Sequence, residues 1–490
     1  MSAWTKTVAY FRGADSSPAE RKLVLKLDFF ILTFCCMAYF MNYLDRQSLS
    51  QAYVSGMKED LNMGASTLTY INTVYACGYL VGIVPNNLML TYFKPRNFFP
   101  LMITIWGLVT MTTAAAKNSE SIMGIRFIQG YFESCTFAGT HYLLGSWYTE
   151  KELGKRSGLF TASGLAGGIF GGLLQAAIYS SINGKGGLTG WRWLYIVDGL
   201  ITLPIAAYGY FLFPDTPRLT TAFYFSAEEK ALAIARVPES PPKAILTKAF
   251  FKKVVTSWPF WAFAVLWTIT NCSEQQSTSS LLQLYMKSAP SGPNTYTVVE
   301  KNYWPTGVQA VGIVSTLIWA TVTDIFGMRW MAGYYISFTA VVSAIIILIP
   351  STTPTGIFGA YYWAGSIYAC QATFFAWAND EMRHEDDATR SVTIAFMNFA
   401  GNTFNAFWPL IFYNSSQAPY FTRGMYCMIV IGTLLAIWTT VILITFRRIH
   451  RKLALIEAEP ATSVDGSIGM VEESPDDKMV QDRKLYSETA

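Results

Sequence analysis

Four charged residues, Asp45, Arg46, Arg126 and Glu133, interrupt long apolar stretches of this 490-residue chain. A charged side chain at membrane depth is costly, so such residues are rare and usually face a cavity or a partner. An arginine can hold a carboxylate through two parallel hydrogen bonds without losing its charge. A carboxylic acid in a poorly solvated cavity can accept and release a proton near physiological pH. The four residues could therefore bind an organic anion together with a proton, or they could form ion pairs that only hold two helices together.

The spacing of these residues suggests how they are arranged. Arg126 and Glu133 are seven residues apart, which returns a helix to within about 20° of the same face, about 10 Å further along its axis. We expect Arg126 nearer the outer surface and Glu133 nearer the middle of one helix, with Asp45 and Arg46 near the outer end of the first helix. Both acids and both guanidiniums then face one outward-opening cavity, where deprotonated Glu133 attracts Arg126.

Polar residues also follow one face of two later stretches: Asn271, Glu274, Gln275 and Thr278 in 257–286, and Asn398, Asn402 and Asn405 in 391–413. We expect Asn398, Asn402 and Glu274 to contact the polar part of a substrate. Glu274 could instead be a further proton site. Hydrogen bonds between helices are the alternative for all of these side chains.

Apolar stretches long enough to cross a membrane recur along most of the chain. Hydrophobic residues make up 52% of it and charged residues only 14%, against roughly 25% charged in an average globular chain. A run of about 20 apolar residues spans the hydrocarbon core as a helix. The sequence thus predicts an all-α membrane protein with twelve transmembrane helices, at 28–45, 66–92, 97–116, 120–148, 157–181, 191–213, 257–286, 304–323, 330–349, 356–377, 391–413 and 423–446.

The predicted helices fall into two sets of six. We divide the chain into an N-terminal segment (1–27), a first bundle (28–213), a polar central loop (214–256), a second bundle (257–446) and a disordered tail (447–490). Two repeated halves are typical of transporters that bind substrate near the membrane mid-plane between the halves. The glycines of 164–172 recur every three or four residues, which indicates close helix packing.

The distribution of basic residues predicts the orientation. Of the 36 Lys and Arg residues, 27 lie on the side that holds both termini and the central loop, and 8 lie on the other. Such a bias places the termini and the central loop in the cytoplasm. Asn414-Ser415-Ser416 would then lie outside, where Asn414 is a candidate glycosylation site.

Several motifs carry a family resemblance. They are Asn42-Tyr43-Leu44-Asp45-Arg46, Arg126-Phe-Ile-Gln-Gly130-Tyr-Phe-Glu133, Gly190-Trp191-Arg192-Trp193 with Asp198-Gly199, Asp324-Ile-Phe-Gly327-Met-Arg329, and Trp377-Ala-Asn379-Asp380-Glu381. Together they resemble the anion:cation symporter family of the major facilitator superfamily, in its fungal allantoate-permease-like branch. Within that branch the chain is most similar to transporters of pantothenate and other vitamin acids. The first-half loop 86–96 departs from the superfamily pattern because it lacks the aspartate.

The resemblance implies a major facilitator fold and proton-coupled symport of a small organic monocarboxylate, with pantothenate favoured, at the plasma membrane. It implies Asp45 and Glu133 as proton sites and the paired Arg46 and Arg126 as the anion site. Other anions (biotin, allantoate, nicotinate or short peptides), exchange in place of symport, and a nutrient-sensing receptor remain alternatives.

Other classes of function have little support in the sequence. We expect no enzyme activity, because no His/Asp cluster accompanies His141 or Glu133. The seven cysteines lie inside apolar runs, so we expect neither a metal site nor a cofactor. A net charge of +4 does not suggest nucleic acid, and no phosphate-binding loop suggests ATP. The expected partners are protons, a small organic anion and the lipid bilayer, and we expect a monomer.

Overall fold

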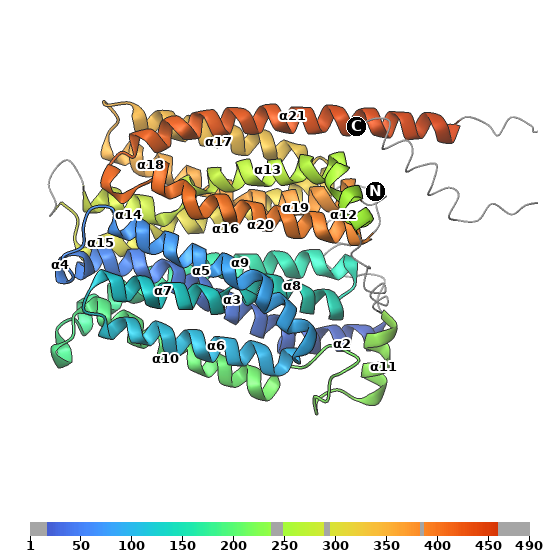
Figure 1. Cartoon of the computed structure of the whole chain (residues 1–490), viewed down its shortest axis with the longest axis horizontal. Coiled ribbons are helices and arrows are strands. Elements are labelled where there is room, and N and C mark those ends of the chain that lie inside the picture. Colours follow the sequence, from blue (N-terminus) through green and yellow to red (C-terminus); the bar gives the residue numbers. More distant parts are fainter. Residues whose placement is uncertain (1–16, 237–247, 289–294, 383–386, 459–490) are drawn as a thin grey trace, which may run out of the picture.

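The computed structural model describes residues 17–236, 248–288, 295–382 and 387–458, and every regular element among them is helical. Two bundles of helices lie side by side with their axes roughly along one direction (Figure 1). The first bundle contains α2 (Pro18–Leu27), η1 (Asp28–Leu32), α3 (Thr33–Ala52), η2 (Tyr53–Met57), α4 (Lys58–Asp60), α5 (Thr67–Tyr92), α6 (Pro95–Thr112), η3 (Thr113–Ala115), α7 (Ser119–Glu133), α8 (Cys135–Trp147), α9 (Glu150–Ser181), η4 (Lys185–Gly187) and α10 (Gly190–Leu212).

The second bundle follows two short helices of the central loop, α11 (Ala227–Arg236) and α12 (Lys248–Thr256). It contains α13 (Trp258–Glu274), η5 (Gln275–Ser277), α14 (Ser279–Lys287), α15 (Val298–Tyr303), α16 (Thr306–Phe326), α17 (Trp330–Leu348), α18 (Pro354–Ala364), η6 (Gly365–Ala369), α19 (Cys370–Glu381), α20 (Asp387–Phe412), η7 (Ser415–Gln417) and α21 (Thr422–Ala458). Across the bundles, α9 packs on α16 and α5 packs on α20.

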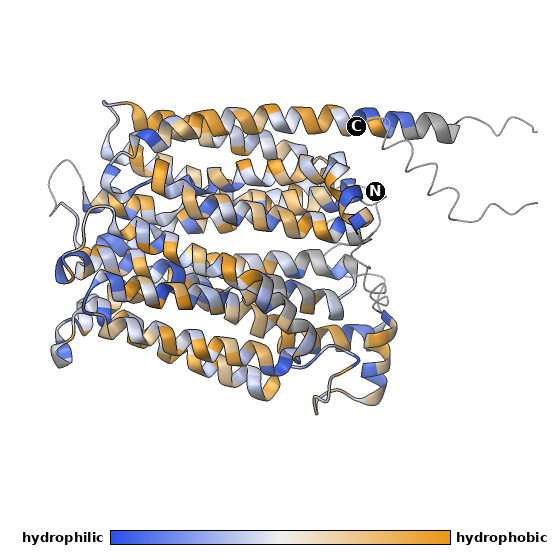
Figure 2. Cartoon of the chain, viewed as in Figure 1, coloured by the Kyte–Doolittle hydropathy of each residue, from blue (hydrophilic) through white to orange (hydrophobic). Residues whose placement is uncertain are grey.

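Helix occupies each of the twelve predicted spans within the described residues. Seven of the helical runs are long and apolar enough to cross a membrane by themselves. Several others are interrupted, between α7 and α8 at Ser134, between α13 and α14 by η5, and between α18 and α19 by η6. Figure 2 shows apolar residues along the long helices and hydrophilic residues gathered at their ends.

The first span is longer than the sequence predicts. Helix continues from Asp28 beyond residue 45, through α3 and into η2, where Ser55 and Gly56 leave helical geometry. Asp45 and Arg46 therefore lie near the middle of the span, and the prediction that they lie near its outer end is wrong. The polar residues after Arg46 suggested a helix end, but side chains such as Gln51 are buried against other helices.

The last helix also extends further than predicted. Residues 447–458 continue α21, so the predicted disordered tail does not begin at 447. The rest of that tail, 459–490, lies outside the described residues, as do 1–16 of the N-terminal segment.

Glycines on α9 let this helix approach both bundles closely. A Cβ added at Gly167 would lie 2.1 Å from the carbonyl oxygen of Phe40 in the first bundle. A Cβ at Gly172 would lie 2.6 Å from the carbonyl oxygen of Asn302 in the second. Both distances are too short for any side chain, so the prediction that these glycines serve close helix packing is confirmed.

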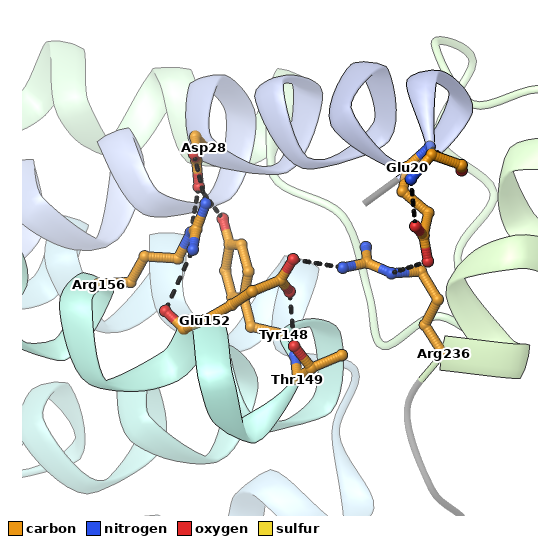
Figure 3. Close-up of polar contacts among 8 residues, drawn as sticks. Glu20, Asp28, Tyr148, Thr149, Glu152, Arg156 and Arg236 are labelled. Atoms are coloured by element: carbon orange, nitrogen blue, oxygen red, sulfur yellow. Dashed lines mark hydrogen bonds and ion pairs between the residues drawn. The ribbon is translucent and has the colours of Figure 1, made fainter. Parts of the chain in front are cut away.

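A network of charged side chains ties the central loop to the first bundle (Figure 3). Arg236 of α11 donates to Glu152 at the start of α9 (Nη2–Oε1 2.5 Å) and lies 3.6 Å from Glu20 of α2. Nearby, Arg156 of α9 pairs with Asp28 of η1 at 2.6 Å. The network fixes α2 and α11 at the end of the bundle that we expect to face the cytoplasm.

The orientation can be tested with single cysteines in a background without the seven native ones. The side chains of Lys252 in α12 and Ser416 in η7 are exposed, and α12 and η7 belong to loops that the basic-residue bias places on opposite sides of the membrane. In intact cells, a membrane-impermeant maleimide should label Ser416→Cys, and should label Lys252→Cys only after permeabilisation. Labelling of both from one side would contradict the helix count.

Candidate functional site

A cavity of about 250 Å³ lies between the two bundles. Its polar side chains come from both of them. The first bundle contributes Arg46, Gln47, Asn72, Tyr75, Tyr79 and Arg126, and the second contributes Gln275, Thr278, Ser280, Asn402 and Asn405. The cationic groups are on the first-bundle wall, and the neutral amides and hydroxyls on the opposite wall.

Arg46 lies on the cavity wall at mid-span and remains partly accessible, with 30% of its side chain exposed. Its Nε donates to the Tyr75 hydroxyl at 2.8 Å. The guanidinium lies 4.8 Å from the ring centre of Tyr79 and 5.7 Å from that of Tyr43. Aromatic faces stabilise a cation without neutralising it, so Arg46 retains the ability to bind an anion.

Arg126 of α7 is almost completely buried, yet it reaches the cavity. Its Nη1 donates to the backbone carbonyl oxygen of Asp45 at 3.0 Å, and its Nη2 donates to the Tyr195 hydroxyl at 3.4 Å. Its Nε has no hydrogen-bond acceptor among the described residues. Both acceptors are neutral, so the charge of Arg126 is held in place but not cancelled by a direct ion pair.

Glu133 is fully buried behind the cavity wall, at the end of α7. Its carboxylate accepts hydrogen bonds from Asn42 Nδ2 at 3.0 Å and Gln129 Nε2 at 2.7 Å. A third, short hydrogen bond comes from the Tyr75 hydroxyl. Because Tyr75 also accepts from Arg46, its hydroxyl links the buried acid to the cavity arginine.

The arginine next to Glu133 is not the one that the spacing suggests. Arg46 Nε lies 4.0 Å from Glu133 Oε2, whereas Arg126 turns toward Asp45 and Tyr195. The reason is the longer first span, which brings Arg46 to the depth of Glu133. The expectation that Glu133 pairs with Arg126 is therefore wrong.

Asp45 also lies outside the cavity wall. It is fully buried, and its carboxyl group faces that of Asp198 on α10. The sequence suggested that both acids face the cavity, but Asp45 and Glu133 lie behind it and Arg46 and Arg126 line it. The two acids can act on a cavity ligand only through the arginines and their hydrogen-bond partners.

The predicted residues of the second bundle divide in a similar way. Asn402 lines the cavity, while Asn398 is behind it and accepts from Asn402 Nδ2 at 2.8 Å. Gln275 and Asn405 both line the cavity and form a short hydrogen bond with each other. The cavity wall of this bundle thus carries three amides, of which Gln275 and Asn405 bond to each other and Asn402 bonds to Asn398 behind the wall.

Glu274 does not line the cavity. It is buried and accepts from Cys370 Sγ at 2.9 Å and from Gln371 Nε2 at 3.2 Å. Both donors are neutral, so direct substrate contact is not supported in this arrangement, and the alternative of a further proton site remains open.

Residues 35–409 match the family model of the Major Facilitator Superfamily. The chain belongs to this superfamily. It is 41% identical over 434 residues to the pantothenate transporter liz1 of Schizosaccharomyces pombe, covering 88% of this chain and 83% of that protein. It is 40% identical to the pantothenate transporter FEN2 of Saccharomyces cerevisiae (84% and 81% covered), and 29% identical to the vitamin H transporter of the same yeast (91% and 76% covered).

Solved structures support the same fold. A bacterial homologue of the human lysosomal transporter Spinster, inward-facing and occupied, matches with a TM-score of 0.63 at 13% identity, covering 87% of this chain and 97% of that one. The predicted all-α, multi-pass membrane architecture of a major facilitator protein is confirmed.

Sequence reasoning missed the contribution of α5 to the site. Asn72, Tyr75 and Tyr79 line the cavity, and their spacing of three and four residues places them on one helix face. That polar and aromatic stripe was visible in the sequence, but aromatic residues in a span usually anchor or pack helices.

Arg126 can be tested as an anion contact with pantothenate and its alcohol analogue, which lacks the carboxylate. Arg126→Ala should weaken pantothenate binding by about 2 kcal/mol or more, roughly 30-fold, and leave binding of the alcohol almost unchanged. Arg126→Lys should rescue only in part, because it lacks the bidentate geometry. Arg423→Ala, at an exposed position outside the cavity, is the control. Normal pantothenate affinity in well-folded Arg126→Ala would remove this arginine from the site.

Proposed function

We propose that this chain is a proton-coupled symporter that carries a small organic monocarboxylate into the cell, with pantothenate as the favoured substrate. The main support is one observation: two guanidiniums, Arg126 on neutral acceptors and Arg46 at 4.0 Å from the buried Glu133, line a cavity whose opposite wall carries amides. The 40–41% identity to two fungal pantothenate transporters over more than four-fifths of this chain supports the substrate.

The chemistry of pantothenate matches the two walls of the cavity. Its carboxylate would bind Arg46 and Arg126, through charge-assisted hydrogen bonds. Its amide and two hydroxyl groups both donate and accept, as do the side-chain amides of Gln275, Asn402 and Asn405. The relative that transports vitamin H makes biotin, another monocarboxylate with an amide-like end, the second substrate to test.

A proton is needed because the anion enters against an inside-negative potential. The electrical free energy that opposes entry is about 2.3 kcal/mol per charge per 100 mV, and one accompanying proton cancels it. In our proposal, protonated Glu133 no longer attracts Arg46, which then receives the substrate carboxylate. Release of the proton restores the attraction between Glu133 and Arg46 and helps to expel the anion.

Contacts at the end opposite the charged network hold the two bundles together. Lys287 Nζ donates to the Tyr53 carbonyl oxygen at 2.7 Å and pairs with Glu59 at 3.0 Å. Ser415 Oγ donates to the Ala65 carbonyl oxygen at 2.5 Å. These contacts support an arrangement closed on the external side.

The remaining features of the proposal concern location. We place the protein in the plasma membrane as a monomer with both termini in the cytoplasm, in keeping with the basic-residue bias. Asn414 would then be external. Its side chain accepts from the Ser416 backbone N–H at 3.0 Å in η7, and attachment of a glycan there remains a prediction.

Glu133→Gln tests the coupling. This change imitates the protonated acid and keeps a hydrogen-bonding group for Tyr75, so substrate binding and exchange across the membrane should persist while accumulation driven by a pH gradient is lost. Counterflow and gradient-driven uptake should be measured in the same proteoliposomes. Glu120→Gln, at an exposed acid near the start of the same helix, should behave like the wild type. If Glu133→Gln concentrates substrate as well as the wild type does, Glu133 is not the coupling site.

Lys287→Ala tests the external closure. Loss of its contacts with Tyr53 and Glu59 should favour opening by about 1 kcal/mol, which corresponds to roughly fivefold. In a background without native cysteines, Ser280→Cys on the cavity wall should react correspondingly faster with an external maleimide. Lys185→Ala, at an exposed lysine of η4, is the matched control, and an unchanged rate with Lys287→Ala would show that this contact does not hold the closed arrangement.

A further inference from the structure

Two fully buried carboxyl groups meet between α3 and α10. Asp45 and Asp198 are each 0% exposed, and their carboxyl groups lie within hydrogen-bonding reach of each other. Ser48 donates to Asp198 Oδ2 at 2.8 Å. Neither oxygen of Asp45, nor Oδ1 of Asp198, receives a donor from any described residue. Unpartnered buried oxygens of this kind call for a physical explanation.

The surrounding helices hold the two acids in this position. Ser48 lies three residues after Asp45 and Tyr195 three residues before Asp198, so each of them is on the same helix face as the acid, and Ser48 reaches across to Asp198. Arg126 of α7 joins the two helices because it donates to the Asp45 carbonyl oxygen and to the Tyr195 hydroxyl. The acid pair is therefore adjacent to the arginine that reaches the cavity.

Two ionised carboxylates cannot share this place. They would repel each other in a poorly screened environment and would leave three oxygens without a donor. One proton converts one acid into a donor for the other and removes the repulsion, as in carboxyl pairs that titrate jointly. The pair then carries one negative charge, which faces the positive charge of Arg126.

A second proton would make the pair neutral and leave Arg126 with an uncompensated charge beside the cavity. We propose that Asp198 is a proton-binding residue that forms a joint site with Asp45, holding one proton when the cavity is empty and a second when Arg126 binds the substrate anion. This inference rests on the proposed symport. The other ionisable groups around the pair are Arg126, Glu133 and Tyr195, with Arg46 on the far side of Glu133.

The alternative is a structural acid pair whose single proton never leaves. The two possibilities differ in the number of protons linked to substrate binding. A permanent proton contributes nothing to the pH dependence of affinity, whereas a proton taken up with the substrate adds one unit to the slope of log Kd against pH.

The test measures pantothenate affinity between about pH 5 and 8, a range that spans physiological pH, and proton-driven uptake in reconstituted wild type, Asp45→Asn and the double variant with Asp45→Asn and Asp198→Asn. Asp45→Asn leaves Asp198 as the ionisable member of the pair, so it should keep the proton-linked slope of log Kd against pH and the driven uptake. The double variant should still bind and exchange pantothenate, with that slope reduced by about one unit and driven uptake diminished. Glu228→Gln, at an exposed acid of α11, should match the wild type.

The outcomes separate the two proposals. If the wild type couples protons to pantothenate and the double variant keeps the same slope and the same accumulation, the joint site is overturned while the symport stands. If the double variant fails to fold, Asp45→Asn decides, because loss of the proton-linked slope in that variant would show that Asp198 takes up no proton and would overturn the joint site. A wild type that binds pantothenate without proton linkage would overturn both proposals.

Discussion

The need to neutralise charge inside an apolar medium governs the centre of this protein. The charges of the first bundle at mid-span lie in one connected set on α3, α7 and α10, linked by Tyr75 and Tyr195. Each guanidinium is held by neutral hydroxyl or carbonyl oxygens or by aromatic faces, and each acid is placed behind it. Removing a partner from such a set leaves a charge with no water to stabilise it, so the positions of three helices depend on these contacts.

The two bundles contribute different groups to the cavity: charged groups from the first and hydrogen-bonding amides from the second. The first bundle supplies the cationic wall and the second the amides of Gln275, Asn402 and Asn405. A transporter must also let its halves move, and the contacts between them suit this purpose. The glycine face of α9 brings backbones together without interlocking side chains, and the outer closure uses a few polar contacts such as Lys287 with Glu59, each of which contributes little.

Much of this arrangement could be predicted from the sequence, and the exceptions have a common cause. Hydropathy located the spans, and helical spacing placed Arg126 and Glu133 on one face of their helix. The end of the first span was missed because polarity alone does not distinguish a loop from a helix whose polar residues face other helices. The pairing of Arg46 with Glu133 and of Asp45 with Asp198 depends on the depth and rotation of separate helices, which no local pattern encodes. Asp198 belongs to the motif that begins at Gly190, which the sequence shows. Its proposed role depends on Asp45, which lies on another helix.

The charges that meet in the described part of this site set a simple condition on transport. Asp45, Glu133 and Asp198 supply three acids, and Arg46 and Arg126 supply two cations. With the cavity empty, neutrality requires one of the acids to be protonated. A monocarboxylate adds one negative charge, so the loaded site is neutral only with a second proton. Since every uncompensated charge at this depth is costly, substrate without a proton, or a proton without substrate, is disfavoured. In the proposed symport, this balance of charge couples at least one proton to each anion, without any contact between the proton and the substrate.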